Sequence, residues 1–241
     1  MKEAQINLYN TDCMEGMKEF PDNYFHLAIV DPPYSITNSR KKGMSAYRGP
    51  NSKSSRKKGF ATKNTEKHEY PQLYESKDWD MNRPDKAYFD ELRRVSKNQI
   101  IWGGNYFADL LPASRGWVYW YKNRFHRNFN RFSDGELAYT SFDKILKQVD
   151  IPWIGLGYLN NEIGEKKIHP TQKPIALYIW LLEKYTKSNN ERILDTHLGS
   201  GSIAIAADKL GFDLWGYELD KDYYEGAVNR LSEHRKQLRL F

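Results

Sequence analysis

The chain has 241 residues, of which 15% are aromatic, and 37 Lys and Arg residues against 31 Asp and Glu give it a formal net charge of +6. That length suits one domain with a real hydrophobic core, and the aromatic content excludes a disordered polymer. The single cysteine excludes an internal disulfide framework, the six scattered histidines without a C-x-x-C pair predict no metal site, and no run approaches the roughly 18 apolar residues of a membrane span.

Strand-like and helical segments alternate through the first half of the chain. In chain order we predict strands at residues 6–10, 26–30, 99–104, 117–121 and 136–141, and helices at residues 13–20 and 84–96. The strand at 26–30 is apolar after its first residue, and two consecutive prolines follow it and stop the strand ladder. Gly103 and Gly104 break the strand that contains them.

The second half shows the same alternation more clearly. Here we predict helices at residues 174–187, 202–210 and 221–235, and strands at residues 192–195 and 213–218. In the first of these helices one buried face is expected, formed by Ile175, Ile179, Leu182 and Tyr185. Gly211 is placed to end the second helix. Alternation of this kind predicts an α/β fold, doubly wound, with a mostly parallel sheet covered by helices on both faces.

Much of the positive charge lies in one segment. Residues 35–68 contain ten of the Lys and Arg residues and one acid, whereas the rest of the chain has more acids than bases. The segment lacks apolar periodicity and predicts a mobile loop. It is either a solvated charge run or an arm that follows a phosphate backbone, because clustered cations release counterions from nucleic acid. A second patch, 119–132, interleaves basic and aromatic residues, and its rings either stack on bases or belong to the core.

A glycine-rich turn joins the predicted strand 192–195 to the helix that follows. Its sequence, Asp195 to Ser202, lets the backbone approach a ligand closely and exposes the N–H groups of a helix N-terminus. Glu218 ends the next strand and is placed to accept hydrogen bonds from ribose hydroxyls. The pattern predicts an adenosine-type cofactor, either NAD or S-adenosylmethionine, or else an ordinary glycine-rich turn.

A second motif, Asp31-Pro32-Pro33-Tyr34, follows the buried strand 26–30. An exocyclic amine of adenine or cytosine is a poor nucleophile, because its lone pair is delocalised into the ring. Acceptance of its two N–H groups by the Asp31 carboxylate and the Pro32 carbonyl would localise that lone pair and stabilise the charge that develops on nitrogen. Tyr34 offers a ring face to a flipped base. The alternative is that the tetrapeptide merely ends a strand.

Four ordered motifs together resemble the amino-methylating DNA methyltransferases. They are the Asp31–Tyr34 turn, the segment His169-Pro170-Thr171-Gln172-Lys173-Pro174, the Asp195–Ser202 loop with Glu218, and Ile100–Phe107, which is similar to a segment of phage and prophage members. Their order resembles the β class. The resemblance implies a circularly permuted, Rossmann-like, S-adenosylmethionine-dependent methyltransferase fold of about seven strands, in which the C-terminal unit docks beside the N-terminal strand.

The resemblance also assigns residues to roles. It implies a catalytic turn formed by Asp31, Pro32, Pro33 and Tyr34. It implies S-adenosylmethionine contacts from Asp12, Cys13, Thr171, Lys173, Asp195, His197, Gly199, Ser200, Gly201, Ser202 and Glu218. Asp12 would lie near the adenine, Thr171 and Lys173 near the methionine carboxylate, and Glu218 at the ribose. His197 stands where the family motif has phenylalanine, so an apolar cofactor contact becomes a polar imidazole.

On this basis we expect a single catalytic domain, 1–241, with a DNA-contacting loop at 35–80 and a target-recognition region at 122–166. Double-stranded DNA is the expected partner, and the basic residues expected to contact it are Arg40, Lys41, Lys42, Arg56, Lys57, Lys58, Lys122, Arg124 and Arg127. The N-terminus is unlike a signal peptide, so we expect a cytoplasmic protein without membrane contact, encoded by a bacterium or phage. A homodimer and a cognate restriction enzyme are left open.

Several alternatives accompany this interpretation. Asp31 favours adenine N6 over cytosine N4, because N4 enzymes of the family more often have serine in that place, although some have aspartate. An NAD-dependent oxidoreductase would share the glycine loop but leaves the Asp31–Tyr34 turn unexplained. A DNA-binding protein without turnover would be expected to have a damaged turn. RNA is a weaker substrate alternative.

Overall fold

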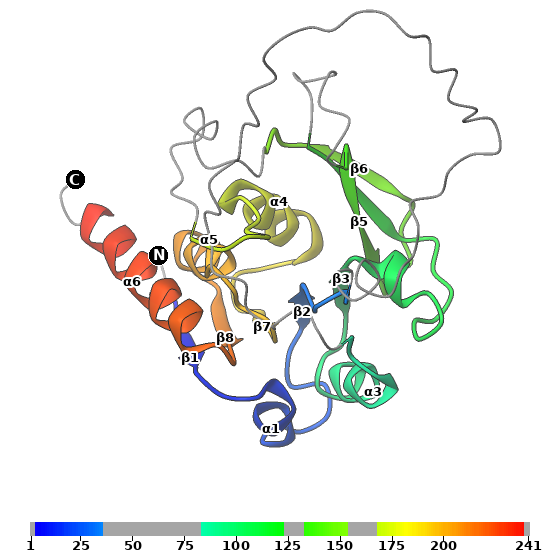
Figure 1. The fold of residues 1–241 in the computed structure, drawn as a ribbon, viewed down its shortest axis with the longest axis horizontal. Helices are drawn as coiled ribbons and strands as arrows, with labels where there is room; N and C mark the ends of the chain where they lie inside the picture. The colour runs from blue at the N-terminus through cyan, green and yellow to red at the C-terminus, as the bar shows by residue number, and fades with distance from the viewer. Residues whose placement is uncertain (1–2, 36–82, 123–132, 154–167, 239–241) are drawn as a thin grey trace, which may run out of the picture.

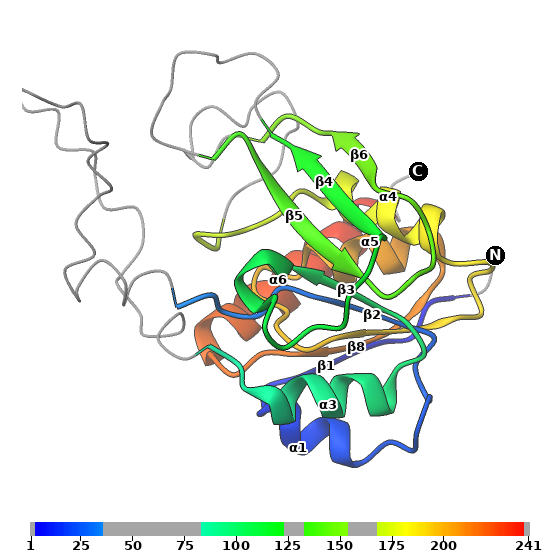
Figure 2. The ribbon, with the colours of Figure 1, turned by 90° about the vertical axis from the view of Figure 1, so that its right-hand side faces the viewer.

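The computed structural model describes residues 3–35, 83–122, 133–153 and 168–238, which form a mixed eight-stranded sheet with helices on both faces (Figure 1, Figure 2). The strands are β1 Ile6–Tyr9, β2 Leu27–Val30, β3 Gln99–Trp102, β4 Trp117–Tyr121, β5 Gly135–Thr140, β6 Lys147–Asp150, β7 Arg192–Asp195 and β8 Asp213–Tyr217. The helices are α1 Cys13–Lys18, α3 Lys86–Val95, α4 Ile175–Tyr185, α5 Ser202–Leu210 and α6 Lys221–Leu238, with a 3-10 turn, η2, at Gly104–Phe107.

The strand order is β1-β8-β7-β2-β3-β5-β4-β6. Strands β1, β8, β7, β2 and β3 are all parallel, which confirms the predicted doubly wound part of the sheet. Beyond β3 the sheet is mixed, since β5 is antiparallel to both β3 and β4, and β6 is parallel to β4. Two antiparallel pairings among the seven of the described sheet leave it mostly parallel, as predicted. Strand β6 was not predicted, because it lies at the sheet edge and buries a single residue, Val149.

The first strand completes the sheet beside the last one. Residues Ile6 to Tyr9 of β1 pair in parallel with Leu214 to Tyr217 of β8, and Figure 1 shows the N-terminus beside α6. This arrangement confirms the circularly permuted fold, in which the C-terminal unit docks against the N-terminal strand.

The central strands β2 and β3 are buried on both faces, which explains why the apolar residues 27–30 and 100–102 follow one another without alternation. Figure 2 shows α1 and α3 on one face and α4, α5 and α6 on the other. Leu27 and Ile29 of β2 pack into the core on the α4 and α5 side, whereas Ala28 and Val30 pack into the core that includes α1 and α3. Among the helices of the described residues, none combines the length and apolar character needed to cross a bilayer.

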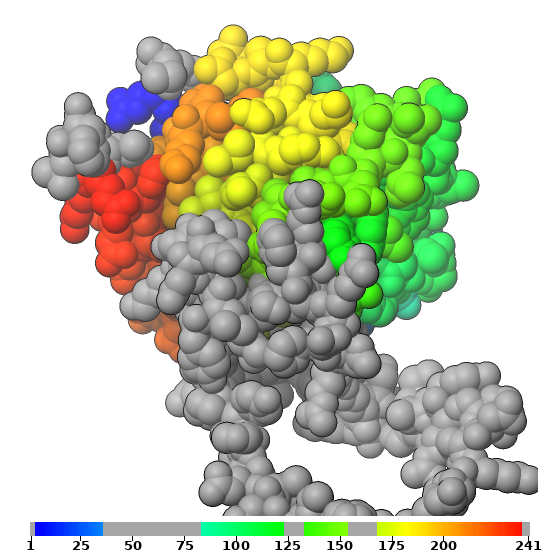
Figure 3. All heavy atoms as spheres, turned by 90° about the horizontal axis from the view of Figure 1, so that it is seen from above, coloured from blue at the N-terminus to red at the C-terminus, as the bar shows by residue number. Residues whose placement is uncertain are grey.

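The predicted buried face of α4 is partly wrong. Leu182 and Tyr185 are buried as expected, but Ile175 and Ile179 are only partly buried, and the remaining buried positions are Leu177, Tyr178 and Leu181. The reason is that α4 has two neighbours. Figure 3 shows α4 (yellow) between α5 (orange) and the strands β4 to β6 (green), so its buried face is wider than one stripe and turned toward Leu177 and Leu181.

Candidate active site

The acidic residues singled out in the sequence converge at one edge of the sheet. Asp12, Asp31, Asp195 and Glu218 stand at or just after the carboxyl ends of β1, β2, β7 and β8. These four strands are adjacent and parallel, and ligands bind at the carboxyl edge of such sheets. Sequence positions more than 200 residues apart therefore contribute to one site.

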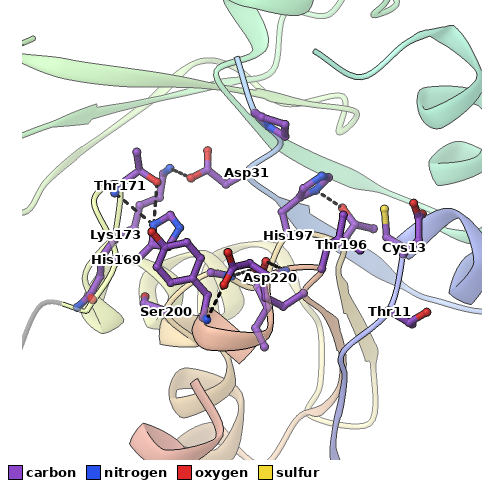
Figure 4. A pocket seen from close by; sticks show the side chains of 18 of the residues that line it. Thr11, Cys13, Asp31, His169, Thr171, Lys173, Thr196, His197, Ser200 and Asp220 are labelled. Atoms are coloured by element: carbon purple, nitrogen blue, oxygen red, sulfur yellow. Dashed lines mark hydrogen bonds and ion pairs between the residues drawn. The ribbon is translucent and has the colours of Figure 1, made fainter. Parts of the chain in front are cut away.

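A cavity of about 470 Å³, here called the glycine-loop cavity, lies at this edge. Its wall includes eight of the predicted cofactor residues: Asp12, Cys13, Thr171, Lys173, His197, Gly199, Ser200 and Glu218. Figure 4 shows Lys173, Thr171 and His169 on one side of the cavity and His197, Thr196 and Cys13 on the other. The volume is within the range of about 300–1,000 Å³ that is typical of small-molecule sites.

Glu218 is fixed on the wall of this cavity by the backbone of two loops. Its Oε2 accepts the N–H of Gly199 at 2.8 Å and its Oε1 accepts the N–H of Asp220 at 2.9 Å. Burial raises the pKa of Glu218, and these backbone hydrogen bonds act against the rise. Each oxygen keeps a further lone pair, so the carboxylate can accept the two hydroxyls of a ribose.

Asp12 and Cys13 form the start of α1 at the far side of the cavity. Asp12 is the N-cap, and its Oδ1 accepts the N–H of Met14 at 2.7 Å. Burial raises the pKa of the Cys13 thiol to about 12, so the thiol is uncharged at neutral pH. The polar atoms on this wall are a carboxylate and a neutral thiol, which suits the amine edge of an adenine.

Three predicted cofactor residues lie behind the cavity wall and support it. Asp195 is buried, and its Oδ1 accepts the N–H of His197 at 3.0 Å. Gly201 has φ of +71° and begins α5, and a Cβ there would lie 2.8 Å from the Cβ of Ala227 on α6. Ser202 accepts a hydrogen bond from Arg230 at 2.9 Å. These residues shape the loop from behind.

His197, the departure from the family motif, takes part in a buried hydrogen-bond chain. The Thr196 hydroxyl lies 2.9 Å from Nδ1 of His197 and 2.6 Å from the hydroxyl of Tyr88 on α3. Burial lowers the pKa of His197 to about 4, so the imidazole is neutral at physiological pH. Tyr88 was missed in the sequence as a site residue, because it reads only as one member of the apolar face of α3.

A second cavity, of about 600 Å³, adjoins the first and is here called the DPPY cavity. All four residues of the Asp31–Tyr34 turn line it, together with residues of η2, β4, β5 and the loop before β5. Asp31, Pro33, Thr171 and Lys173 line both cavities. The two spaces therefore meet at the Asp31 carboxylate.

Both oxygens of Asp31 have a partner. The Tyr34 hydroxyl donates to Oδ1, and the Lys173 ammonium pairs with Oδ2. Lys173 also lies 3.3 Å from Oε2 of Glu136 on β5. Its ammonium thus points to the Asp31–Tyr34 turn, although the resemblance assigned it to the methionine carboxylate. Nothing in the sequence marks Glu136 as a site residue, since it looks like an ordinary polar position of a strand.

Tyr34 stacks on Tyr106, with ring centroids 4.9 Å apart and planes 19° from parallel. Gly103, with φ of +65°, lies against the Tyr34 ring, and a Cβ there would come within 2.2 Å of it. Only glycine meets both conditions, which explains why β3 ends just before this residue. One face of Tyr34 is therefore covered by Tyr106.

The predicted DNA contacts mostly fall outside the described residues. That holds for Arg40, Lys41, Lys42, Arg56, Lys57, Lys58, Arg124 and Arg127, which stay predictions. Lys122, at the end of β4, is described. It pairs with Glu136, and its ammonium lies 4.8 Å from the centroid of the Trp120 ring.

The raised pKa of Asp195 can be tested through the pH dependence of the protein's stability. Burial, Asp31 and Glu218 raise its pKa to about 8 from an ordinary 3.8, with the His197 N–H opposing. Between about pH 4 and pH 8 the unfolded chain ionises this carboxyl while the folded chain keeps it protonated, so stability falls as pH rises. We expect Asp195→Asn to unfold at higher urea than wild type at pH 8 and to lose most of that advantage at pH 5. Parallel pH dependence of the two midpoints would contradict the raised pKa.

Comparison with known proteins agrees with this geometry. A family model described as DNA methylase, N6_N4_Mtase, matches residues 53–229. The Type II methyltransferase M.HpaI of Haemophilus parainfluenzae is 24% identical over 259 residues, covering 92% of this chain and 72% of that protein. The Type II methyltransferase M2.LlaDCHI of Lactococcus lactis subsp. cremoris is 31% identical over 115 residues, 46% of this chain and 38% of that protein.

Solved structures are similar in fold. M1.HpyAVI in complex with SAM has a TM-score of 0.54 at 18% identity, covering 94% of this chain and all of that one (100%). PvuII DNA methyltransferase (cytosine-N4-specific) also has a TM-score of 0.54, at 13% identity, covering 98% of this chain and 93% of that one. A methylase accounts for the glycine loop and the Asp31–Tyr34 turn together, which the NAD alternative did not. The chain belongs to the N6/N4 DNA methylases, the S-adenosylmethionine-dependent methyltransferases that act on amino groups of DNA bases.

Proposed function

We propose that this chain methylates N6 of adenine in double-stranded DNA, by base flipping and direct in-line transfer from S-adenosylmethionine. The observation that supports it best is the position of Asp31, whose carboxylate lies where the two cavities meet. A cofactor in one cavity and an extrahelical base in the other would face each other across this residue. The catalytic turn is intact, which argues against a DNA-binding protein without turnover.

The glycine-loop cavity fits the cofactor. Glu218 would accept the ribose hydroxyls, Asp12 and Cys13 would lie at the adenine, and Gly199, Ser200 and Thr171 would surround the methionine part. When bound, S-adenosylmethionine supplies an electrophilic methyl group on a positively charged sulfur. The protein's own contribution is to hold acceptors on the opposite side of that methyl group.

In the DPPY cavity, Asp31 and the Pro32 carbonyl would each accept one N–H of the target amine. The nitrogen lone pair then points at the methyl group, and as the N–C bond forms, positive charge develops beside a carboxylate. Formation of this N–C bond would break the bond between the methyl group and sulfur and leave S-adenosylhomocysteine, and the methylated nitrogen would then lose one proton to solvent to restore neutrality. Tyr34 and Tyr106 provide aromatic surface for the base, and no covalent bond to the protein is required.

We assign residues 1–241 to one catalytic domain, with the basic segment 35–80 following the DNA backbone and residues 122–166 contributing to target recognition. Adenine N6 is preferred because position 31 is aspartate. Cytosine N4 is the second candidate, since its amine offers the same two N–H donors and PvuII DNA methyltransferase, described as cytosine-N4-specific, shares the fold.

The experiment is a product analysis. Purified protein is incubated with unmethylated duplex DNA and S-adenosylmethionine labelled on the methyl group, and the hydrolysed nucleosides are separated by mass spectrometry. We expect labelled N6-methyladenine. Labelled N4-methylcytosine would revise the base, preferred labelling of competing RNA would revise the substrate, and the absence of label from any polynucleotide would refute methyl transfer altogether.

A further inference from the structure

Four side chains of alternating charge form a series of ion pairs at the wall of the DPPY cavity. Asp31 pairs with Lys173, Lys173 lies 3.3 Å from Glu136, and Glu136 pairs with Lys122. Two carboxylates and two ammonium groups give the cluster a net charge of zero. The residues come from the turn after β2, the segment before α4, the start of β5 and the end of β4, so only the folded chain assembles it.

Lys173 is the central member of this cluster and its most buried one. Its side chain is 3% exposed, and its ammonium lies 5.2 Å from the centroid of the Trp102 ring. Burial acts to lower the pKa of Lys173, but Asp31 and Glu136 outweigh it and raise the pKa above its ordinary value. A lysine in these surroundings stays charged, and its two ion-pair partners are the carboxylates of Asp31 and Glu136.

The other titratable groups near Asp31 supply no competing cation. Tyr34, Tyr88 and Tyr178 are buried phenols whose pKa values burial raises, so they are neutral. Asp195, on the neighbouring strand β7, is an acid whose pKa burial and Asp31 raise to about 8, so it is uncharged at neutral pH and supplies no cation. Within the described ranges, Lys173 is the cation in contact with Asp31.

Because an ionised carboxylate is the stronger acceptor for an amine N–H, the transfer step depends on Asp31 being charged. Resting on the proposed function, we infer that Lys173 is a positioning residue for that step: placed between Glu136 and Asp31, it holds the Asp31 carboxylate in an ion pair directed into the DPPY cavity, and it does not bind the methionine carboxylate. When the target amine reaches Asp31, Glu136 remains as an acceptor for the ammonium.

The inference predicts a specific pH effect. Without the Lys173 charge, Asp31 and Glu136 are two partly buried carboxylates in one cluster, and each disfavours the charge of the other. The active, ionised form of Asp31 is then reached only at higher pH. Replacing Glu136 as well removes one of the two repelling charges, so the double variant should be less affected than the single one.

The test is a set of single-turnover methyl-transfer rates between pH 5 and pH 9 at saturating cofactor. For Lys173→Met we expect the acid limb of the profile to move up by about one pH unit or more, so that at a pH on that limb the rate is roughly tenfold lower than in wild type. Lys173→Arg, which keeps the charge, should restore the wild-type position of the limb. Glu136→Gln/Lys173→Met should lie between Lys173→Met and wild type. Affinity for S-adenosylhomocysteine, measured by calorimetry, should change by less than about threefold in all of them.

Two results of the rate measurements would overturn the inference: an acid limb in Lys173→Met that coincides with that of wild type, or a double variant that is more impaired than Lys173→Met. A large loss of S-adenosylhomocysteine affinity would also overturn it, because it would show that Lys173 binds the cofactor. Circular dichroism checks folding. If Lys173→Met does not fold, the double variant, which removes one charge of each sign, is compared with Glu136→Gln and Lys173→Arg in the same way. Failure of the proposed function is distinguished by the wild-type protein, which would then label no DNA at any pH.

Discussion

Asp31→Asn is expected to reduce methyl transfer by about 10²–10³-fold, the loss typical of removing one group that stabilises developing charge in a transition state. Asparagine keeps the shape of the side chain and one acceptor oxygen, but it is neutral, so it no longer stabilises positive charge on the target nitrogen. Lys173 retains Glu136 as a partner, so the substitution leaves the buried ammonium paired. The measurement is the single-turnover rate with labelled S-adenosylmethionine and duplex DNA.

The control for this substitution is Asp90→Asn, an exposed aspartate of α3 that pairs with Lys86 and Arg93 away from both cavities. Its rate should equal that of wild type. In Asp31→Asn the affinity for S-adenosylhomocysteine should be retained, because the cofactor's other contacts are unchanged. A rate within threefold of wild type, on the scale of a tenfold change per 1.4 kcal/mol, would remove Asp31 from the catalytic role.

Glu218→Ala is expected to weaken cofactor binding by about 10²–10⁴-fold, since it removes a carboxylate that would accept two ribose hydroxyls and each such charge-assisted hydrogen bond contributes about 1.5–3 kcal/mol. The same substitution leaves the N–H groups of Gly199 and Asp220 without their acceptor, so the glycine loop also loses its fixed position. Equilibrium binding of S-adenosylmethionine and S-adenosylhomocysteine measures the effect.

Glu218→Gln separates the two contributions, because an amide oxygen can still accept one backbone N–H but carries no charge. We expect an intermediate loss of affinity. Glu225→Ala, on the exposed side of α6 where Glu225 pairs with Lys221, should bind as wild type does. If Glu218→Ala and Glu225→Ala bind the cofactor equally well, the ribose is held elsewhere.

The residues that lie within contiguous motifs could be predicted from the sequence. In the Asp31–Tyr34 turn and in the Asp195–Ser202 loop, the residues that indicate a function lie within a few positions of one another. The strands before them are recognisable by their apolar character. The parallel half of the sheet follows from the same signals. Strand β6 does not, because an edge strand with one buried side chain leaves almost no pattern.

Partners from distant segments could not be predicted. Lys173 and Asp31 are 142 positions apart, and their pairing depends on how the segment before α4 crosses the ends of β2 and β5. Glu136 and Tyr88 are a polar strand position and a helix-face tyrosine in the sequence, and each becomes a site residue only through what the fold places beside it. Resemblance named Lys173 as a functional residue, but its neighbours in space indicate a different role from the one the resemblance implied.

The pairing of β1 with β8 has a consequence for how the protein is made. The backbone N–H of Gln5 donates a hydrogen bond to Asp213 across 208 positions, so β1 has no place in the sheet until the ribosome has also synthesised β8. Asp12 and Cys13 reach the cavity only through that late pairing. The side of the cavity formed by Asp12 and Cys13 is therefore completed only after β8 has been synthesised, and a nascent chain stalled before β8 would carry the Asp31–Tyr34 turn beside an unfinished cavity.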